Sequence, residues 1–120
     1  MANPDERVIA WVASAKKDFL TFPHDVVRNI GYNLGRIQVG KAPERAKVLH
    51  GLGGGVWELL EDYDGNAHQT VYFVRFDDVV YVLHCYQKKS TKGATTPKPD
   101  IDLIRRRLAV ALDHYERRRR

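Results

Sequence analysis

The sequence predicts an α+β fold in which the strands and most of the helices occupy separate parts of the chain. The middle of the chain alternates apolar and polar residues with a period of two, which is typical of β-strands. The segments on either side repeat apolar residues every three or four positions, which is typical of helices. With 120 residues, 43% of them apolar, we expect a single domain over residues 1–120.

The N-terminal third predicts one strand and two helices. The apolar run 8–13 is expected to form a strand. Ser14 can cap a helix over 14–22, and Pro23 suits the first turn of a second helix over 23–40. The apolar stripe of this second helix should face a core and comprises Val26, Val27, Ile30, Leu34 and Ile37.

The middle of the chain predicts an antiparallel meander. Three runs are rich in Val, Tyr, Phe and Trp, and they span residues 56–62, 68–76 and 79–87. Asp64-Gly65 is a strong hairpin signal between the first two runs, and Asp77-Asp78 fits a turn between the second pair. The glycine-rich segment 51–56 lacks the Gly-Lys-Ser/Thr ending of a phosphate-binding loop, so we expect a flexible connection.

A last helix follows a polar loop over 87–99 and is expected to start at Asp100 or Asp102. Its predicted buried face comprises Ile101, Ile104, Leu108, Ala111, Leu112 and Tyr115. We expect residues 117–120, four arginines, to fray or to form a mobile basic tail. The helices together are expected to cover one face of the sheet and to leave the other accessible.

The excess positive charge lies in the last third of the chain. Residues 84–120 carry 11 Lys/Arg and 4 Asp/Glu, whereas residues 1–83 carry 9 and 11. This distribution favours a polyanionic partner, nucleic acid before membrane, although a solvated basic tail would give the same count. No apolar run approaches the ~20 residues of a membrane span, and the N-terminus lacks the pattern of a signal peptide. We therefore expect a cytoplasmic protein.

The titratable side chains indicate no metal or cofactor. The single cysteine, Cys85, excludes an internal disulfide and lies in an apolar strand, which predicts a buried, inert thiol. None of the histidines has metal-ligand spacing. Apolar neighbours make His84 a candidate structural, hydrogen-bonded histidine, whereas His68 lies near a strand start and is expected to be an exposed acid or base.

The distinctive polar segment follows the last predicted strand. Lys88 and Lys89 leave the end of that strand, and the loop after them contributes Lys92, Thr95, Thr96 and Lys98. Ammonium groups fixed at a strand end would hold a phosphate better than groups on a floppy tail. An ordinary exposed loop is the alternative.

Motifs along nearly the whole chain resemble one protein family. They include AWVASAKKDF, LGRIQVGKAPERAKVLHGLGGGVWEL, VYFVRF, VYVLHCYQKKS and TTPKPDIDLIRRRL, and the order of KK, then TP, then an Ile-Asp-Leu helix is the most specific element. The chain is similar to the RelE/HigB-like toxins of type II toxin–antitoxin systems, in their phage-derived HigB-like branch.

The resemblance implies a RelE-like fold and cleavage of mRNA, in most members on the translating ribosome, without a metal. It also implies a partner antitoxin, often a helix-turn-helix protein. Lys89 matches a basic residue that the family places at this strand end, and Lys88 accompanies it, which makes both candidates for phosphate stabilisation and proton transfer. The candidate RNA-binding residues around them are Lys92, Thr96, Lys98, Arg105 and Arg106.

Two positions depart from the family pattern. Relatives usually carry Tyr-Arg where this chain has His68-Gln69, and many carry an arginine at the position of Leu60. Gln69 can bind a phosphate but brings no charge. We expect His68 to substitute as acid or base and Arg75 as cation. The alternative is a toxin-fold protein without catalysis, which binds a target protein or its antitoxin and operator.

The register of the last two strands decides which candidates share a face. A three-residue turn after Phe76 would place on one face Gln69, Arg75 and Lys89. A two-residue turn would place Gln69 with Tyr86 and Lys88. We expect the first register, because it assembles the site that the resemblance implies.

Overall fold

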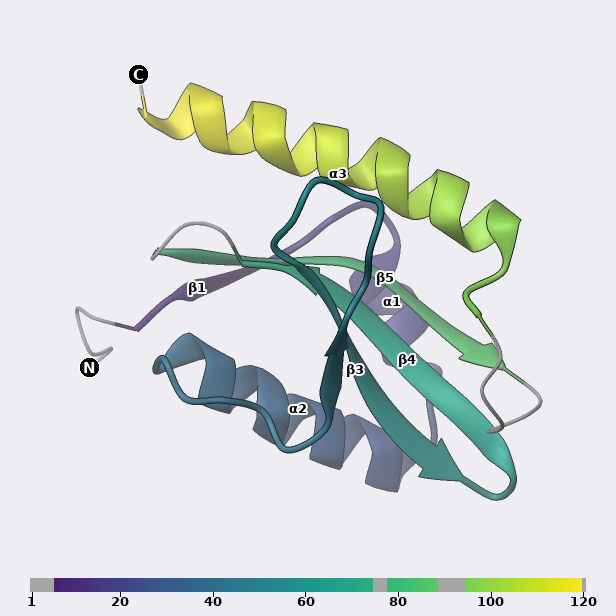
Figure 1. Cartoon of the computed structure of the whole chain (residues 1–120). Helices are drawn as coiled ribbons and strands as arrows, with labels where there is room; N and C mark the ends of the chain where they lie inside the picture. The colour runs from purple at the N-terminus through teal and green to yellow at the C-terminus, as the bar shows by residue number, and fades with distance from the viewer. Residues whose placement is uncertain (1–5, 75–77, 89–94, 120) are drawn as a thin grey trace.

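The computed structural model describes residues 6–74, 78–88 and 95–119. Its elements, in chain order, are β1 (Val8–Trp11), α1 (Ala15–Phe19), α2 (His24–Gln38), β2 (Ala46–Val48), β3 (Val56–Tyr63), β4 (Asn66–Phe73), β5 (Val79–Lys88) and α3 (Lys98–Arg119). In these ranges the strands form one five-stranded sheet in the order β1-β5-β4-β3-β2. The mixed α+β architecture and the RelE-like fold are confirmed (Figure 1).

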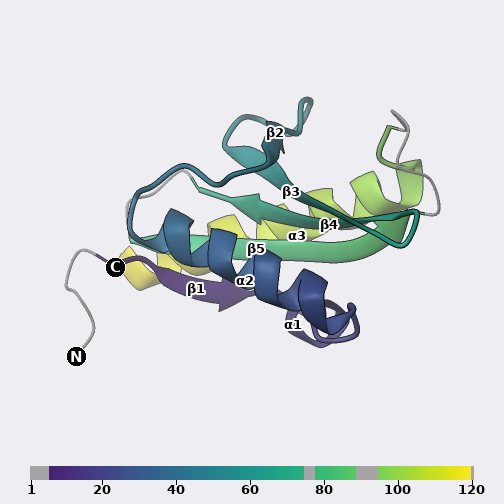
Figure 2. The ribbon, with the colours of Figure 1, turned by 90° about the horizontal axis from the view of Figure 1, so that it is seen from below.

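Helices cover both faces of the sheet, so the expectation of one accessible face is wrong. One core packs α1 and α2 against side chains that include Tyr72 and Val82. The other packs α3 against side chains that include Phe73 and Leu83 (Figure 2). The reason lies in β4 and β5, whose residues are buried in long uninterrupted runs. Strands that are apolar on both sides need cover on both sides.

The two edges of the sheet differ from a simple meander. β1 pairs in parallel with β5, with Val8 opposite Val79 and Trp11 opposite Val82. At the other edge, β2 pairs antiparallel with β3, an element that the sequence did not predict. Three residues with a lysine in the middle give no periodic signal, and β2 exists because β3 supplies its hydrogen bonds.

Both predicted helices of the N-terminal part are present, but α1 ends at Phe19 rather than at residue 22. Ser14 precedes α1 without a side-chain cap, because its hydroxyl donates to Asp18 Oδ2 at 2.8 Å instead. α2 begins after Pro23. The stripe on α2 faces the sheet: Val26, Ile30, Leu34 and Ile37 are buried and Val27 is partly buried. Asn33, also buried, accepts the backbone N–H of Glu44 at 2.8 Å and so holds the segment after α2 against the helix.

The β3–β4 hairpin turns at Asp64 and Gly65, as predicted. Both residues have positive φ, 50° and 78°, which is the conformation of a two-residue type I′ turn. Glycine adopts it without a steric cost. An added Cβ meets nothing within 4 Å at either Gly65 or Gly31, so the two positions differ in backbone conformation and not in space. Gly31 lies in the exposed part of α2 and has no positive φ.

We expect Gly65→Ala to lower the free energy of unfolding by about 1–2 kcal/mol, because an L side chain in the left-handed region is strained. Gly31→Ala is the matched control and should raise it by about 0.5–1 kcal/mol, because alanine favours the helix. Urea unfolding of the two variants measures both changes. Destabilisation of similar size in both would contradict the assignment of strain to the turn.

The glycine-rich connection before β3 packs against α3 rather than remaining a free loop (Figure 1). Leu52 is buried in the core under α3, and Arg105 Nη1 lies 3.5 Å from the carbonyl oxygen of Gly51. The positive φ angles of the glycines fold the connection back toward the helix.

The last helix begins earlier than predicted, at Lys98, and its described part continues to Arg119. The expectation that residues 117–120 fray or form a mobile basic tail stays a prediction. Arg117 pairs with Asp113 at 2.8 Å, and Arg118 lies 3.9 Å from Asp78. The predicted buried face is correct, with Ile104, Leu108 and Ala111 buried and Ile101, Leu112 and Tyr115 partly buried. Across the described ranges no helix combines the length and the apolar character needed to cross a membrane.

Candidate active site around Glu58 and Lys88

The end of β5 and the start of α3 lie at the same end of the sheet (Figure 1). Polar side chains meet there on the α3 face of the sheet. β3 contributes a glutamate, β2 and β5 contribute one lysine each, and a tyrosine and a threonine come from β5 and from the segment before α3. The Glu58 cluster comprises Lys47, Glu58, Tyr86, Lys88 and Thr96.

Glu58 lies at the centre of the cluster, and its side chain is 0% exposed. Its Oε1 atom is 2.9 Å from the hydroxyl of Tyr86 and 3.3 Å from the hydroxyl of Thr96, and these two hydroxyls are 3.2 Å apart. The three oxygens form a triangle in which both hydroxyls can donate toward the carboxylate. Such bonds offset the cost of burying a carboxylate.

Two lysines surround the carboxylate. Lys47 Nζ is 3.7 Å from Glu58 Oε2, and Lys88 Nζ lies 5.9 Å from the centre of the Tyr86 ring. Lys88 is only 9% exposed. Burial lowers the pKa of the Lys88 ammonium, the charge of Glu58 opposes that change, and the charge of Lys47 adds to it. Lys88 therefore releases its proton more readily than an exposed lysine does.

Tyr86 and His84 tie the cluster to the start of α3. Burial raises the pKa of the Tyr86 phenol, so it stays a neutral hydrogen-bond donor. The His84 ring stacks on Tyr86 with centroids 5.0 Å apart, and its Nε2 is 2.7 Å from Asp100 Oδ1. The prediction of a hydrogen-bonded structural histidine at position 84 is confirmed.

Gln69 lies beside the cluster, directly opposite Tyr86 in the neighbouring strand. The side chain is 3% exposed, and its Oε1 has no hydrogen-bond partner among the residues that the structure describes. Opposite residues in an antiparallel pair share a face, so Gln69 faces the same side as Tyr86 and Lys88.

The register that we expected for β4 and β5 is therefore wrong. The pairs Val71–His84 and Tyr72–Val82 leave Leu83 without a partner, which marks a β-bulge in β5. The expected register assumes uninterrupted pairing of β4 and β5 from the turn onward. One extra residue in β5 shifts every pair beyond the bulge by one position, which exchanges the two faces of the strand. Arg75 and Lys89, the other members of the expected set, lie outside the described residues.

His68 was expected to be exposed, and this prediction is also wrong. Its side chain is 1% exposed and packs edge-on against Phe22, with ring centroids 4.9 Å apart. Burial lowers the pKa of the His68 imidazole, against the opposing effects of Glu61 and Asp62. Because neighbours in a strand point to opposite faces, His68 lies on the α2 side of the sheet, away from Lys88.

The candidate RNA-binding residues that the structure describes lie on the same side as the cluster. Thr96 belongs to it, and Lys98 pairs with Asp102 at 2.9 Å one turn into α3. Arg105 and Arg106 are exposed further along the helix. Lys92 lies outside the described residues.

A groove of about 630 Å³ adjoins the cluster, between β2 and the start of α3, and its lining includes Lys47, His50, Thr95 and Ile101. The sequence analysis missed Lys47 and Glu58 as site residues. A signal for Glu58 was present, since it is a charged residue at an inward-facing strand position between Val56 and Leu60.

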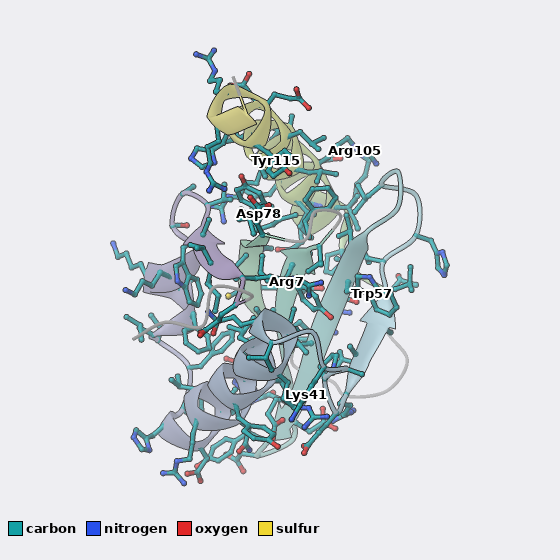
Figure 3. The ribbon with its side chains drawn as sticks, turned by 90° about the vertical axis from the view of Figure 1, so that its left-hand side faces the viewer. Arg7, Lys41, Trp57, Asp78, Arg105 and Tyr115 are labelled. Carbon is teal, nitrogen blue, oxygen red and sulfur yellow. The ribbon has the colours of Figure 1, made fainter. Side chains whose placement is uncertain are left out.

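A second cavity lies on the opposite face of the sheet and contains none of the predicted site residues. It measures about 470 Å³, and its lining includes Tyr72. Arg7, Lys41 and Trp57, which also line it, are labelled in Figure 3. Burial raises the pKa of the Tyr72 phenol to about 12. Within the described ranges, no three His, Cys, Asp or Glu side chains lie close enough together to hold a metal ion.

Cys85 is buried, as predicted, and burial raises the pKa of its thiol to about 12 from an ordinary value of 9.0. Only the thiolate reacts readily with alkylating reagents.

We expect iodoacetamide at pH 8 to modify Cys85 about 10³-fold more slowly in the folded protein than in urea, because the pKa difference lowers the thiolate fraction by that factor. Mass spectrometry of timed samples measures the two rates. Similar rates in the two states would contradict the buried, protonated thiol.

The mixed sheet with helices on both faces, and the charged cluster where β5 meets α3, define a RelE-like α+β protein. The sequence pattern of the family described as phage-derived protein Gp49-like (DUF891) matches residues 17–109. The chain belongs to this Gp49-like family. No curated protein matches the chain.

Proposed function

We propose that this protein is the toxin of a type II toxin–antitoxin system, of the RelE/HigB-like kind, and that it cleaves mRNA on the translating ribosome without a metal. Membership of the Gp49-like family and the sequence resemblance support a toxin. The observation that carries the nuclease is Lys88, a largely buried ammonium with a lowered pKa at the end of β5. The segment that follows adds Lys89 and Lys92.

The proposed reaction is attack of a ribose 2′-hydroxyl on the adjacent phosphorus. A base removes the hydroxyl proton, the bond from the 2′-oxygen to phosphorus forms, the bond to the 5′-oxygen breaks, and an acid protonates that oxygen. Lys88 and Lys89 stabilise the charge that develops on the phosphate, and Lys88 supplies the proton. The products are a 2′,3′-cyclic phosphate and a 5′-hydroxyl.

We assign to Arg75 the positive charge that relatives usually supply with an arginine at the position of Gln69. His68 faces the other side of the sheet and is left out of the reaction. Gln69 faces the cluster and can donate a hydrogen bond to a phosphate oxygen without adding charge.

Gln69 also favours a second candidate function. Where the family usually places an arginine, this chain holds a buried neutral amide beside the lysines. Loss of one preorganised charge stabiliser costs about 10²–10³ in rate. A protein of the same fold that binds a target protein, or its antitoxin and operator, without cutting RNA fits this feature.

The test is to induce the protein alone in bacteria and to map an abundant message by primer extension. Lys89→Ala is compared with Lys17→Ala, an exposed lysine on α1 at the opposite face of the sheet. We expect cuts inside translated codons with the wild type and with Lys17→Ala, and none with Lys89→Ala. Growth arrest with intact RNA would favour the second function.

The proposal includes a cognate antitoxin, of the helix-turn-helix kind, and action in the cytoplasm. Acidic and apolar residues of the antitoxin would complement the basic surface of the toxin. Co-expression of a helix-turn-helix protein encoded beside this gene is expected to restore growth, and an unrelated helix-turn-helix protein should not.

A further inference from the structure

Glu58 connects the two ends of the lysine-bearing segment. Tyr86 stands in β5 just before Lys88, and Thr96 stands just before α3. Both hydroxyls contact the same carboxylate oxygen of Glu58, at 2.9 Å and 3.3 Å. A single side chain on β3 thus reaches the residues on either side of a segment that carries Lys88, Lys89 and Lys92.

The second carboxylate oxygen faces the cations. Glu58 Oε2 has no hydrogen-bond partner among the described residues and lies 3.7 Å from Lys47 Nζ. An interaction at this distance is electrostatic rather than a hydrogen bond. Because the Glu58 side chain is fully buried, its charge acts on nearby ammonium groups more strongly than a surface carboxylate would.

Charged groups on the neighbouring elements act on the Lys88 ammonium. Glu58 on β3 and Asp100 on α3 favour its charged form, whereas Lys47 on β2 and burial beside the Tyr86 ring disfavour it. His84 on β5 binds Asp100, so that carboxylate is shared. Among the charges that raise the pKa of Lys88, that of Glu58 has the largest effect.

We propose that Glu58 is the positioning residue of the lysine site: its carboxylate joins the end of β5, at Tyr86, to the residues before α3, at Thr96, and its negative charge favours the charged form of Lys88 beside Lys47. This inference deepens the proposed function and rests on it for its biological purpose. The physical claim concerns the folded protein alone and is measured without RNA.

Two substitutions separate the charge of Glu58 from its hydrogen bonds. Glu58→Gln keeps an oxygen that accepts from both hydroxyls but removes the charge. Thr96→Val removes one donor and keeps the charge. The matched control is Glu61→Gln, on the same strand at the opposite face, where the carboxylate accepts from Asn29 at 2.9 Å.

The first readout is the titration of Lys88, followed by NMR of protein with carbon-13 in its lysine ε-methylenes. In Glu58→Gln we expect Lys88 to lose its proton at a lower pH than in the wild type, because an attractive charge is gone. Glu61→Gln and Thr96→Val should leave the Lys88 titration unchanged. An equal titration in Glu58→Gln and wild type would overturn the charge role.

The second readout is the rate of trypsin cleavage after Lys88. We expect cleavage about tenfold faster in Thr96→Val, because loss of a hydrogen bond to a charged group weakens the link between Glu58 and the residues before α3 and lets the end of β5 open locally. Glu61→Gln should match the wild type. Wild-type cleavage of Thr96→Val would overturn the tethering role, even where Glu58→Gln fails to fold.

The outcomes also separate this inference from the nuclease. A wild type that leaves RNA intact refutes the proposed function, and the Lys88 titration and the trypsin rates then still decide the role of Glu58. A wild type that cuts RNA, with Lys88 titrating alike in all variants, refutes the role of Glu58 alone.

Discussion

Replacing Lys88 by alanine is expected to lower the rate of RNA cleavage by about 10²–10³-fold, the usual loss when one preorganised charge stabiliser is removed. Lys88 is held at the end of β5 against the Tyr86 ring, close to Glu58, so its ammonium needs little rearrangement when charge develops on the phosphate. The measurement is the rate at which cut message appears in a cell-free translation system supplied with purified toxin.

Lys17→Ala is the control, because Lys17 is an exposed lysine on α1 at the other face of the sheet. Its cleavage rate should equal that of the wild type. Circular dichroism checks that Lys88→Ala folds. A folded Lys88→Ala protein that cuts at a rate within threefold of the wild type, against the ~10²–10³-fold loss expected, would remove Lys88 from the reaction.

The second large effect concerns the attachment of α3. Ile104 is fully buried in the core between α3 and the sheet, together with Leu108 and Ala111. We expect Ile104→Ala to lower the free energy of unfolding by about 2–5 kcal/mol, because it removes buried apolar atoms and leaves a cavity. Urea unfolding followed by tryptophan fluorescence measures the change.

Val110 provides the comparison on the same helix, because its side chain is 58% exposed. Val110→Ala should change the free energy of unfolding by no more than about 0.5 kcal/mol. A small effect of Ile104→Ala would show that α3 contributes little to stability and that the sheet is held by α1 and α2.

Local patterns predicted most of the elements. The period of two identified β3, β4 and β5, and the turn at Asp64-Gly65 followed from residues that tolerate positive φ. The stripes on α2 and α3 were assigned correctly, because a helix that covers a core must place its apolar residues on one side.

The arrangement of those elements depended on information that no local pattern contains. β2 has three residues and forms only because β3 lies beside it. The nearly continuous apolar sequence of β5 is typical of a strand with helices on both faces of its sheet. Such a sequence does not identify which helix covers which face. The bulge at Leu83 decides the register of β4 and β5, and no local sequence pattern marks its position.

The candidate site was anticipated in part. Lys88 and Thr96 were named because the last strand runs into a basic loop and because this stretch resembles the toxin family. His68 was misjudged, because its burial depends on Phe22, which is distant in sequence. Glu58 was missed, because a lone glutamate in an apolar strand indicates some buried partner without identifying Tyr86 or Thr96.

The parallel pair between β1 and β5 has a consequence for the order in which the chain assembles. β3, β4 and β5 are neighbours in sequence and in space, so they can pair as soon as each hairpin closes. Val8, in contrast, pairs with Val79, far away in the sequence. Closing the long loop between them costs conformational entropy and is slow. On a growing chain, the N-terminal strand is made first and paired late, and the strand that completes it ends at Lys88. The part of the sheet that carries Glu58, Tyr86 and Lys88 is therefore paired before β1 closes the sheet edge.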